Sequence, residues 1–293
     1  MLLGLEWREN FEFAAVPVFL SSMPDCVAVD IGNSRIKIGR FDRANKSPLP
    51  EPASILDLSI TDHANGHFDS TELDAWCRNN ILGPTEWLVG SVHRTAGQKL
   101  IGAVNDWSRR SQIQCRTRTL SFLDVPLKIS VEEPGRVGID RLLGAVAANR
   151  LRKPDRAAIV VDLGTAITVD LLDASGTFAG GAILPGIGMS ARALADQTDA
   201  LPHVVMEDLA EPPAAPGKST ESAIQAGLYW GAVGAIRALV SQLASALKQQ
   251  PELYFTGGAS QQVADLFAQH GSVHHVPHLV LAGIAIVAGD RRI

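Results

Sequence analysis

The stretch Cys26-Val-Ala-Val-Asp-Ile-Gly-Asn-Ser-Arg-Ile-Lys-Ile-Gly-Arg-Phe41 returns in outline as Ala158-Ile-Val-Val-Asp-Leu-Gly-Thr-Ala-Ile-Thr-Val-Asp-Leu-Leu172. Each copy is an apolar run, then Asp-x-Gly with a small polar pair, then a second alternating run. Asp162 follows Asp30 by 132 residues. Apolar, β-branched runs joined by a glycine-containing turn are typical of a β-hairpin. The sequence therefore predicts a duplicated strand–turn–strand unit.

The chemistry of each unit is expected at its turn. Small side chains leave backbone N–H groups free to face phosphate oxygens, and a carboxylate there can hold a cation. Two such turns facing one another would clamp a nucleotide. One Asp-x-Gly by itself is a common turn, so the alternative for each copy is an ordinary hairpin. The repetition favours the clamp.

Composition narrows the class of protein. The 293 residues, 46% of them hydrophobic, are enough for a core in each of two lobes. The net charge is -5 and no run of Lys and Arg exceeds a pair, which argues against nucleic acid as a partner and for a small molecule. Cys26, Cys77 and Cys115 have no CxxC spacing, which fits a protein of the reducing cytoplasm without a disulfide framework.

Neither end of the chain predicts a membrane segment. Residues 1–24 include the apolar stretch 14–20, which is too short for a secretory signal. We expect them to be a disordered or non-native extension. The longest apolar tract, 276–289, is shorter than the ~20 residues of a membrane span and predicts a buried C-terminal helix.

Strands and helices alternate along the rest of the chain, which predicts an α/β fold. Pro154 ends a helix just before the second Asp-x-Gly strand, so we divide the chain into lobes at 25–153 and 154–293. In the second lobe we expect a strand within 176–186, a helix at 189–195, a long helix at 219–249 and a last strand at 252–255. Gly227, Gly231 and Gly234 would place small residues on one face of the long helix, as at a close-packed interface.

Three tempting patterns are set aside. Gly186-Ile-Gly-Met-Ser-Ala191 follows Pro185 at the end of a glycine-rich stretch, and helix entry explains it better than a dinucleotide fingerprint. Gly217-Lys-Ser219 lacks the earlier glycine of a P-loop. The histidines, among them His274, His275 and His278, form no helical metal-ligand pair, and we assign them no role.

Four segments survive together: Asp30-Ile-Gly-Asn-Ser34, Gly138-Ile-Asp-Arg141, Asp162-Leu-Gly-Thr-Ala166 with Thr168 and Asp170, and Thr256-Gly-Gly258. Their order resembles the superfamily of actin, sugar kinases and heat-shock ATPases, in which nucleotide binds between two duplicated RNase H-like lobes. The runs GIDR, VDLGTAITVD, GGAILPG and TESAIQAGLYWGAVG are similar to those of type III pantothenate kinases. The resemblance covers about Val27 to Gly283.

This resemblance implies phosphorylation of pantothenate to 4′-phosphopantothenate, the first step towards coenzyme A, by a homodimer using ATP with Mg²⁺. It implies that ATP phosphates contact Asp30, Ile31, Gly32, Asn33, Ser34, Arg35, Ile36, Lys37 and Thr165. Asp162 would hold a monovalent cation, K⁺ or NH₄⁺. Pantothenate would contact Gly138, Ile139, Asp140, Arg141 and Thr220, with Asp140 as the general base.

General chemistry is consistent with these roles. An alcohol that attacks a γ-phosphate needs a positioned carboxylate for its proton and a cation near the phosphates. The structural alternative for Asp140 is a helix N-terminal carboxylate beside Arg141.

The chain departs from the family pattern in three places. Val131 stands where Tyr is usual, Glu133-Pro134 replaces Asn-Pro, and Ser91-Val-His-Arg94 replaces a Ser-Val-x-Pro turn. Two other functions stay open: a non-catalytic, nucleotide-sensing transcription accessory factor, and a kinase of the same superfamily for another small alcohol.

Overall fold

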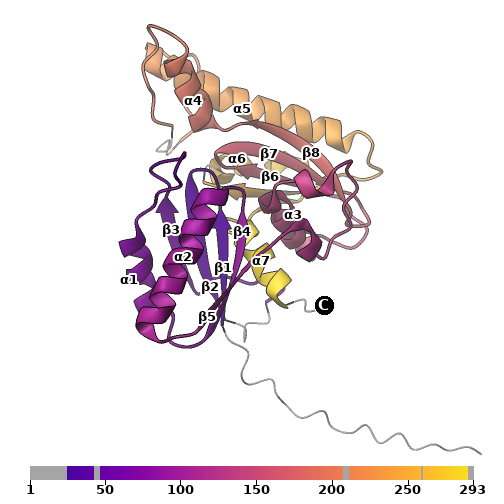
Figure 1. Ribbon diagram of the computed structural model, residues 1–293. Helices are drawn as coiled ribbons and strands as arrows, with labels where there is room; N and C mark the ends of the chain where they lie inside the picture. Colours follow the sequence, from indigo (N-terminus) through magenta and orange to yellow (C-terminus); the bar gives the residue numbers. More distant parts are fainter. Residues whose placement is uncertain (1–24, 43–46, 207–210, 259, 290–293) are drawn as a thin grey trace, which may run out of the picture.

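The computed structural model describes residues 25–42, 47–206, 211–258 and 260–289, which form two five-stranded sheets (Figure 1). The first sheet has the order β3-β2-β1-β4-β5 and the second β8-β7-β6-β9-β10. In each, the first strand pairs antiparallel with the second and parallel with the fourth. The duplication therefore extends from the hairpin to the whole sheet, and the expected α/β fold of two RNase H-like lobes is confirmed. The strands are β1 (Asp25–Ile31), β2 (Arg35–Phe41), β3 (Ser54–Ser59), β4 (Thr85–Ser91), β5 (Cys115–Thr119), β6 (Ala158–Leu163), β7 (Ala166–Leu172), β8 (Phe178–Pro185), β9 (Glu252–Gly257) and β10 (Val273–His275).

The helices form three layers around these sheets. Alternation along β1 sends Val27 and Val29 towards α1 and α2, and Ala28 towards the inner layer of α3 and α7. The far side of the second sheet packs on α5 and α6. The order of layers is thus helices, sheet, shared helices, sheet, helices. The helices are α1 (Ser70–Asn80), α2 (Arg94–Ser111), α3 (Ile139–Leu151), α4 (Ile187–Asp196), α5 (Thr220–Ala244), α6 (Ser260–Asp265) and α7 (Leu279–Gly289), with 3-10 turns at Phe122–Asp124, Pro134–Arg136 and Ala268–His270.

The inner layer joins the two halves of the molecule. Helix α7, near the end of the chain, packs on α3 and on β1 of the first sheet, as its position in Figure 1 shows. Gly283 permits this close crossing, because a Cβ there would stand 2.0 Å from the backbone oxygen of Leu143. The buried C-terminal helix is confirmed. The lobe division at 153/154 stays a prediction. Helix α7 belongs to the second lobe by sequence, but it packs on β1 and α3 of the first.

Two expected boundaries were wrong. The strand at 252–255 is not the last, because β10 follows it and pairs with it in parallel. A three-residue Val-His-His strand has too little alternation to be predicted. The long helix ends at Ala244 rather than at residue 249, because the backbone N–H and hydroxyl of Ser245 both donate to the carbonyl of Gln242 and close the last turn. The expected N-terminal extension, 1–24, lies outside the described residues.

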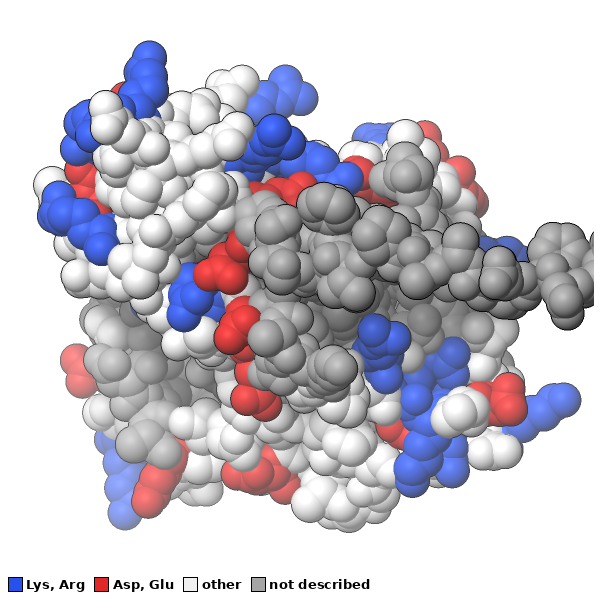
Figure 2. Space-filling view, turned by 90° about the horizontal axis from the view of Figure 1, so that it is seen from below, with Lys and Arg blue, Asp and Glu red and all other residues white. Residues whose placement is uncertain are grey.

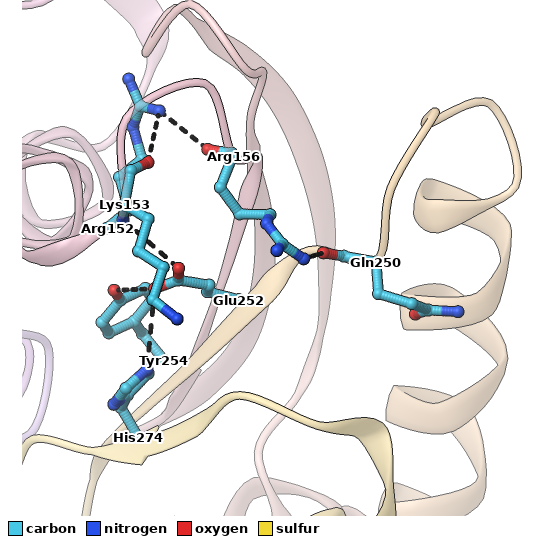
Figure 3. A network of polar contacts seen from close by, with 7 residues as sticks. All are labelled: Arg152, Lys153, Arg156, Gln250, Glu252, Tyr254 and His274. Carbon is cyan, nitrogen blue, oxygen red and sulfur yellow. Dashed lines mark hydrogen bonds and ion pairs between the residues drawn. The ribbon is translucent and has the colours of Figure 1, made fainter.

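The segment between α3 and β6 is fastened to the second sheet (Figure 3). Arg152 donates from Nη1 to the carbonyl of Arg156 at 2.7 Å. The Glu252 side chain, 3% exposed, accepts the Lys153 N–H at 3.3 Å and the Tyr254 hydroxyl at 2.8 Å. A buried carboxylate with two donors is costly to disturb. The segment at the proposed lobe boundary is therefore held against β9 by hydrogen bonds.

Candidate active site

The two Asp-x-Gly turns meet. The Thr165 hydroxyl of the β6–β7 turn donates to the Ser34 hydroxyl of the β1–β2 turn at 2.9 Å. Each turn is closed by a backbone hydrogen bond from its glycine, Gly32 to Arg35 and Gly164 to Ala166. The duplicated hairpins thus face one another across the two sheets. This is the arrangement that a nucleotide clamp requires.

Asp30 and Asp162 are partly buried carboxylates near the ends of β1 and β6. Burial raises the pKa of Asp30 to about 7, with repulsion from Asp140 adding to it. Burial likewise raises the pKa of Asp162 to about 6. The Lys37 ammonium, whose strand position is paired with Asp30, opposes both shifts. The negative charges of these two carboxylates are only partly balanced by Lys37. They are therefore suited to bind a cation, either directly or as the metal that accompanies a phosphate.

Asp140 lies in the first turn of α3, and its negative charge acts on both Asp30 and Asp162. Burial raises its own pKa, although the Arg141 N–H donates to its Oδ1 at 2.8 Å. A Cβ on Gly138 would stand 2.5 Å from that Oδ1, so Gly138 leaves room for the carboxylate. A carboxylate of raised pKa beside the clamp is suited to accept a proton.

The segment Thr256-Gly-Gly258 passes directly beside Asp162. Gly257 has φ +97°, and a Cβ there would stand 2.7 Å from Asp162 Oδ1. Only glycine combines this backbone conformation with so close an approach. The late Gly-Gly therefore belongs to the same site as the two turns.

The other residues of the first loop are divided between core and surface. The Ile31 and Ile36 side chains are fully buried in the core, so only their backbone can face a phosphate. Arg35 turns to Asp57, with Nη1 3.2 Å from Oδ2. The Asn33 carbonyl lies 2.7 Å from His63 Nδ1, a contact that holds the turn from outside.

The GIDR segment lies against β7 and β8. Arg141 pairs with Asp170 of β7 and stacks over Phe178 of β8, 5.7 Å from its ring centre. Val131, which replaces the usual Tyr, packs near this place, 3.4 Å from the position a Cβ would take at Gly180. Gly138, Ile139, Asp140 and Arg141 are thus brought beside the clamp, with Ile139 buried in the inner layer.

Thr220 lies elsewhere. It begins α5 and lines an open apolar groove of about 450 Å³ between α4 and α5, with Leu194, Leu201, Ala223 and Ile224. In one chain, the two parts of the expected pantothenate site therefore lie on different elements: the start of α5, and the start of α3 beside β7 and β8.

Sequence reasoning missed a hydrogen-bonded chain behind the Gly-Gly segment. The buried Ser260 hydroxyl donates to the Gly257 carbonyl at 2.6 Å. His275 Nε2 lies 2.8 Å from the Ser260 hydroxyl oxygen. Because the hydroxyl has one proton, His275 must donate to it. The order Gly-Gly-x-Ser was visible in the sequence, but the partner on β10 was not.

The carboxylates of Asp30, Asp140 and Asp162 offer oxygen atoms rather than the nitrogen and sulfur ligands that most transition metals prefer. Within the described ranges, no cluster of three or more His, Cys, Asp and Glu side chains could hold a metal ion. A cation at Asp162 would therefore be completed by backbone, hydroxyl, water or phosphate oxygens, which suits a hard, weakly bound ion.

The two five-stranded sheets and their facing turns define a class of fold, that of the actin-like ATPases and sugar kinases. A solved structure from Sinorhizobium meliloti, a candidate 2-dehydro-3-deoxygalactonokinase, shares this fold with a TM-score of 0.50 at 13% identity, over 91% of this chain and 99% of that one.

The family is narrower. The family model for type III pantothenate kinase matches residues 26–242. Relatives named type III pantothenate kinase are 39% identical in Rhodopirellula baltica, over 87% of this chain and 95% of that protein, and 33% identical in Alkalilimnicola ehrlichii, over 92% and 99%. The chain belongs to the type III pantothenate kinase family, and it is a kinase.

Proposed function

We propose that this protein transfers the γ-phosphoryl group of ATP to the primary hydroxyl of pantothenate, giving 4′-phosphopantothenate for coenzyme A synthesis. The observation that carries the proposal is the contact between the two turns, Thr165 Oγ1 to Ser34 Oγ at 2.9 Å, with Asp140 close enough to raise the pKa of Asp30. Nucleotide phosphates and a general base then share one cleft.

The residues divide the work as follows. The loop from Asp30 to Lys37 and Thr165 bind ATP phosphates through backbone N–H groups, hydroxyls and the Lys37 ammonium. Asp140 accepts the proton of the attacking hydroxyl, for which its raised pKa is favourable. Gly138, Ile139, Arg141 and Thr220 position pantothenate. Phosphoryl transfer needs little beyond this positioning and charge neutralisation.

Two kinds of cation complete the proposal. Mg²⁺ accompanies ATP near Asp30, and a monovalent cation, K⁺ or NH₄⁺, is held by Asp162. The fit rests on the carboxylate itself: Asp162 is partly buried, desolvation raises its pKa, and repulsion from Asp140 and Asp170 adds to that rise. When bound, these ions supply positive charge next to the phosphates.

We infer that the working unit is a homodimer formed through α5. This helix is long and apolar enough to span a membrane by length and composition, a test that core helices also pass, yet only 33% of its most apolar window is buried. The exposed side has a stripe of small residues, and a Cβ at Gly227, Gly231 or Gly234 would contact nothing within 4 Å. A second copy on this face would cover the stripe and the groove at Thr220.

The protein is expected to act in the cytoplasm and to bind no nucleic acid. On the face shown in Figure 2, the Lys and Arg side chains stand among Asp and Glu side chains rather than in one basic field. A mixed surface gives little of the electrostatic attraction that nucleic-acid binding needs.

The experiment is ADP release with ATP, Mg²⁺ and a panel of alcohols that includes pantothenate. The proposal predicts release that depends on pantothenate, with phosphate found on its primary hydroxyl. Release with a different alcohol alone would identify a kinase of another specificity. Nucleotide binding without release in any mixture would indicate the regulatory function.

A further inference from the structure

We propose that Asp170 is a positioning residue that holds the Arg141 guanidinium against β7, with its unused N–H donors directed to the alcohol substrate. The inference rests on the proposed function, because it deepens the role given there to Arg141.

The pair has a side-on geometry. Arg141 Nε lies 3.0 Å from Asp170 Oδ1 and 3.1 Å from Oδ2, and Nη2 donates to Oδ1 as well. A guanidinium has five N–H donors, and this arrangement uses the Nε–H and one on Nη2. Both N–H groups of Nη1 and the second on Nη2 are left for acceptor oxygens of a substrate.

The pair is built into the inner layer. The exposed fractions of the side chains are 2% for Asp170 and 14% for Arg141. Phe178 lies under the guanidinium, which favours a cation over its ring face. Gly181 of β8 leaves the space that the carboxylate fills, because a Cβ there would stand 2.4 Å from Asp170 Oδ1. Each group around Arg141 thus fixes one orientation of its side chain.

A contribution to folding stability does not by itself explain the buried Arg141–Asp170 ion pair. Replacing a buried ion pair with apolar residues is often neutral or stabilising. The position is better explained by what surrounds it. Arg141 adjoins Asp140 in sequence, and Asp140 also feels the charges of Asp30, Asp162 and Asp170 from three strands.

From this place the Arg141 charge also acts on Asp140 and opposes the rise in the pKa of that carboxyl. Asp170 therefore fixes the guanidinium at one place beside the general base, so that Asp140 accepts the proton while Arg141 orients the substrate.

The test is steady-state kinetics of Asp170→Asn, which keeps the size of the side chain and removes its charge. We expect the KM for pantothenate to rise about tenfold, as for a lost hydrogen bond to a charged group, with the KM for ATP within about twofold of wild type. Asp74→Asn is the matched control. Asp74 also binds an arginine through two hydrogen bonds, 2.8 and 2.9 Å from Arg110, but on α1, and its loss should change neither KM.

A double variant separates positioning from structure. If Asp170 acts through Arg141, then Asp170→Asn changes the pantothenate KM less than about twofold in an Arg141→Ala background. Independent, multiplying effects would overturn the inference, as would an unchanged pantothenate KM or an equal rise in the KM for ATP in folded Asp170→Asn.

If Asp170→Asn does not fold, Arg141→Lys carries the test, because lysine keeps the charge but cannot bridge both carboxylate oxygens. An unchanged pantothenate KM in that variant would overturn the inference. Wild-type protein inactive on pantothenate would overturn the proposed function together with it, whereas active wild type with an insensitive Asp170→Asn overturns this inference alone.

Discussion

At the scale of single residues, three partly buried carboxylates decide what this site can do. Asp30, Asp140 and Asp162 come from β1, α3 and β6, and burial raises the pKa of each. Their charges repel, so the nucleotide-free site is electrostatically unfavourable until cations or protons enter it. Such clusters are more typical of functional sites than of structural cores.

The general base is tested by Asp140→Asn. We expect turnover to fall by about 10²-fold or more, with ATP affinity little changed, because the amide cannot take the proton but fills the same space. Turnover is measured by ADP release and ATP affinity by calorimetry. A near-normal turnover would remove Asp140 from the mechanism and leave it the role of a helix N-terminal carboxylate.

Asp30 gives a prediction for stability. Its pKa is raised from 3.8 to about 7, so between these pH values the folded protein binds more protons than the unfolded chain. Stability of the nucleotide-free protein therefore falls as pH rises through this window. Asp30→Asn should raise the Tm at pH 8 by roughly 3 °C or more, flatten its pH dependence and still abolish activity. A lower Tm at pH 8 would show that the carboxylate stabilises the fold.

At the scale of elements, the crossing of α3 and α7 joins the lobes. Gly283→Ala would press a methyl group against the Leu143 carbonyl, and we expect a loss of stability of about 1–3 kcal/mol. Gly102→Ala on α2, where a Cβ would meet nothing within 4 Å, is the control and should stabilise slightly. Urea unfolding measures both variants. Equal midpoints would mean that the helices can separate at no cost.

The elements also show what the sequence could predict. Both Asp-x-Gly hairpins, α7 and β8 were predictable, because each has a local pattern of alternation, turn residues or unbroken apolar content. The seating of α7 on the first sheet was not, since any apolar helix could cover either sheet. Asp170 and His275 were in view, but their partners Arg141 and Ser260 come from other elements, and side-chain pairing across a fold leaves no local signal.

At the scale of the whole molecule, the exposed stripe on α5 predicts a dimer. Gly231→Arg should shift the protein towards a monomer and raise the pantothenate KM, because Thr220 lies in the groove beside the same face. Analytical ultracentrifugation gives the mass in solution. Gly102→Arg, on an exposed helix elsewhere, should leave the dimer intact. A monomeric wild type, or a dimeric Gly231→Arg, would contradict an interface through α5.

In the proposed mechanism, the duplication divides the cation chemistry between the lobes. Asp30, at the turn of the first sheet, would meet the phosphates and their Mg²⁺, whereas Asp162, at the turn of the second sheet beside Gly257, would hold the monovalent cation. The two carboxylates should therefore fail in different ways. Asp30→Ala should be close to inactive at any potassium concentration, because productive phosphate geometry is lost.

The most direct test of two facing turns is the initial rate of ADP release against potassium chloride, with sodium chloride holding the ionic strength constant. For Asp162→Ala we predict a basal, magnesium-dependent rate that potassium no longer stimulates, while the wild type is stimulated. If Asp162→Ala responds to potassium as the wild type does, the second turn holds no cation and the clamp described here is wrong.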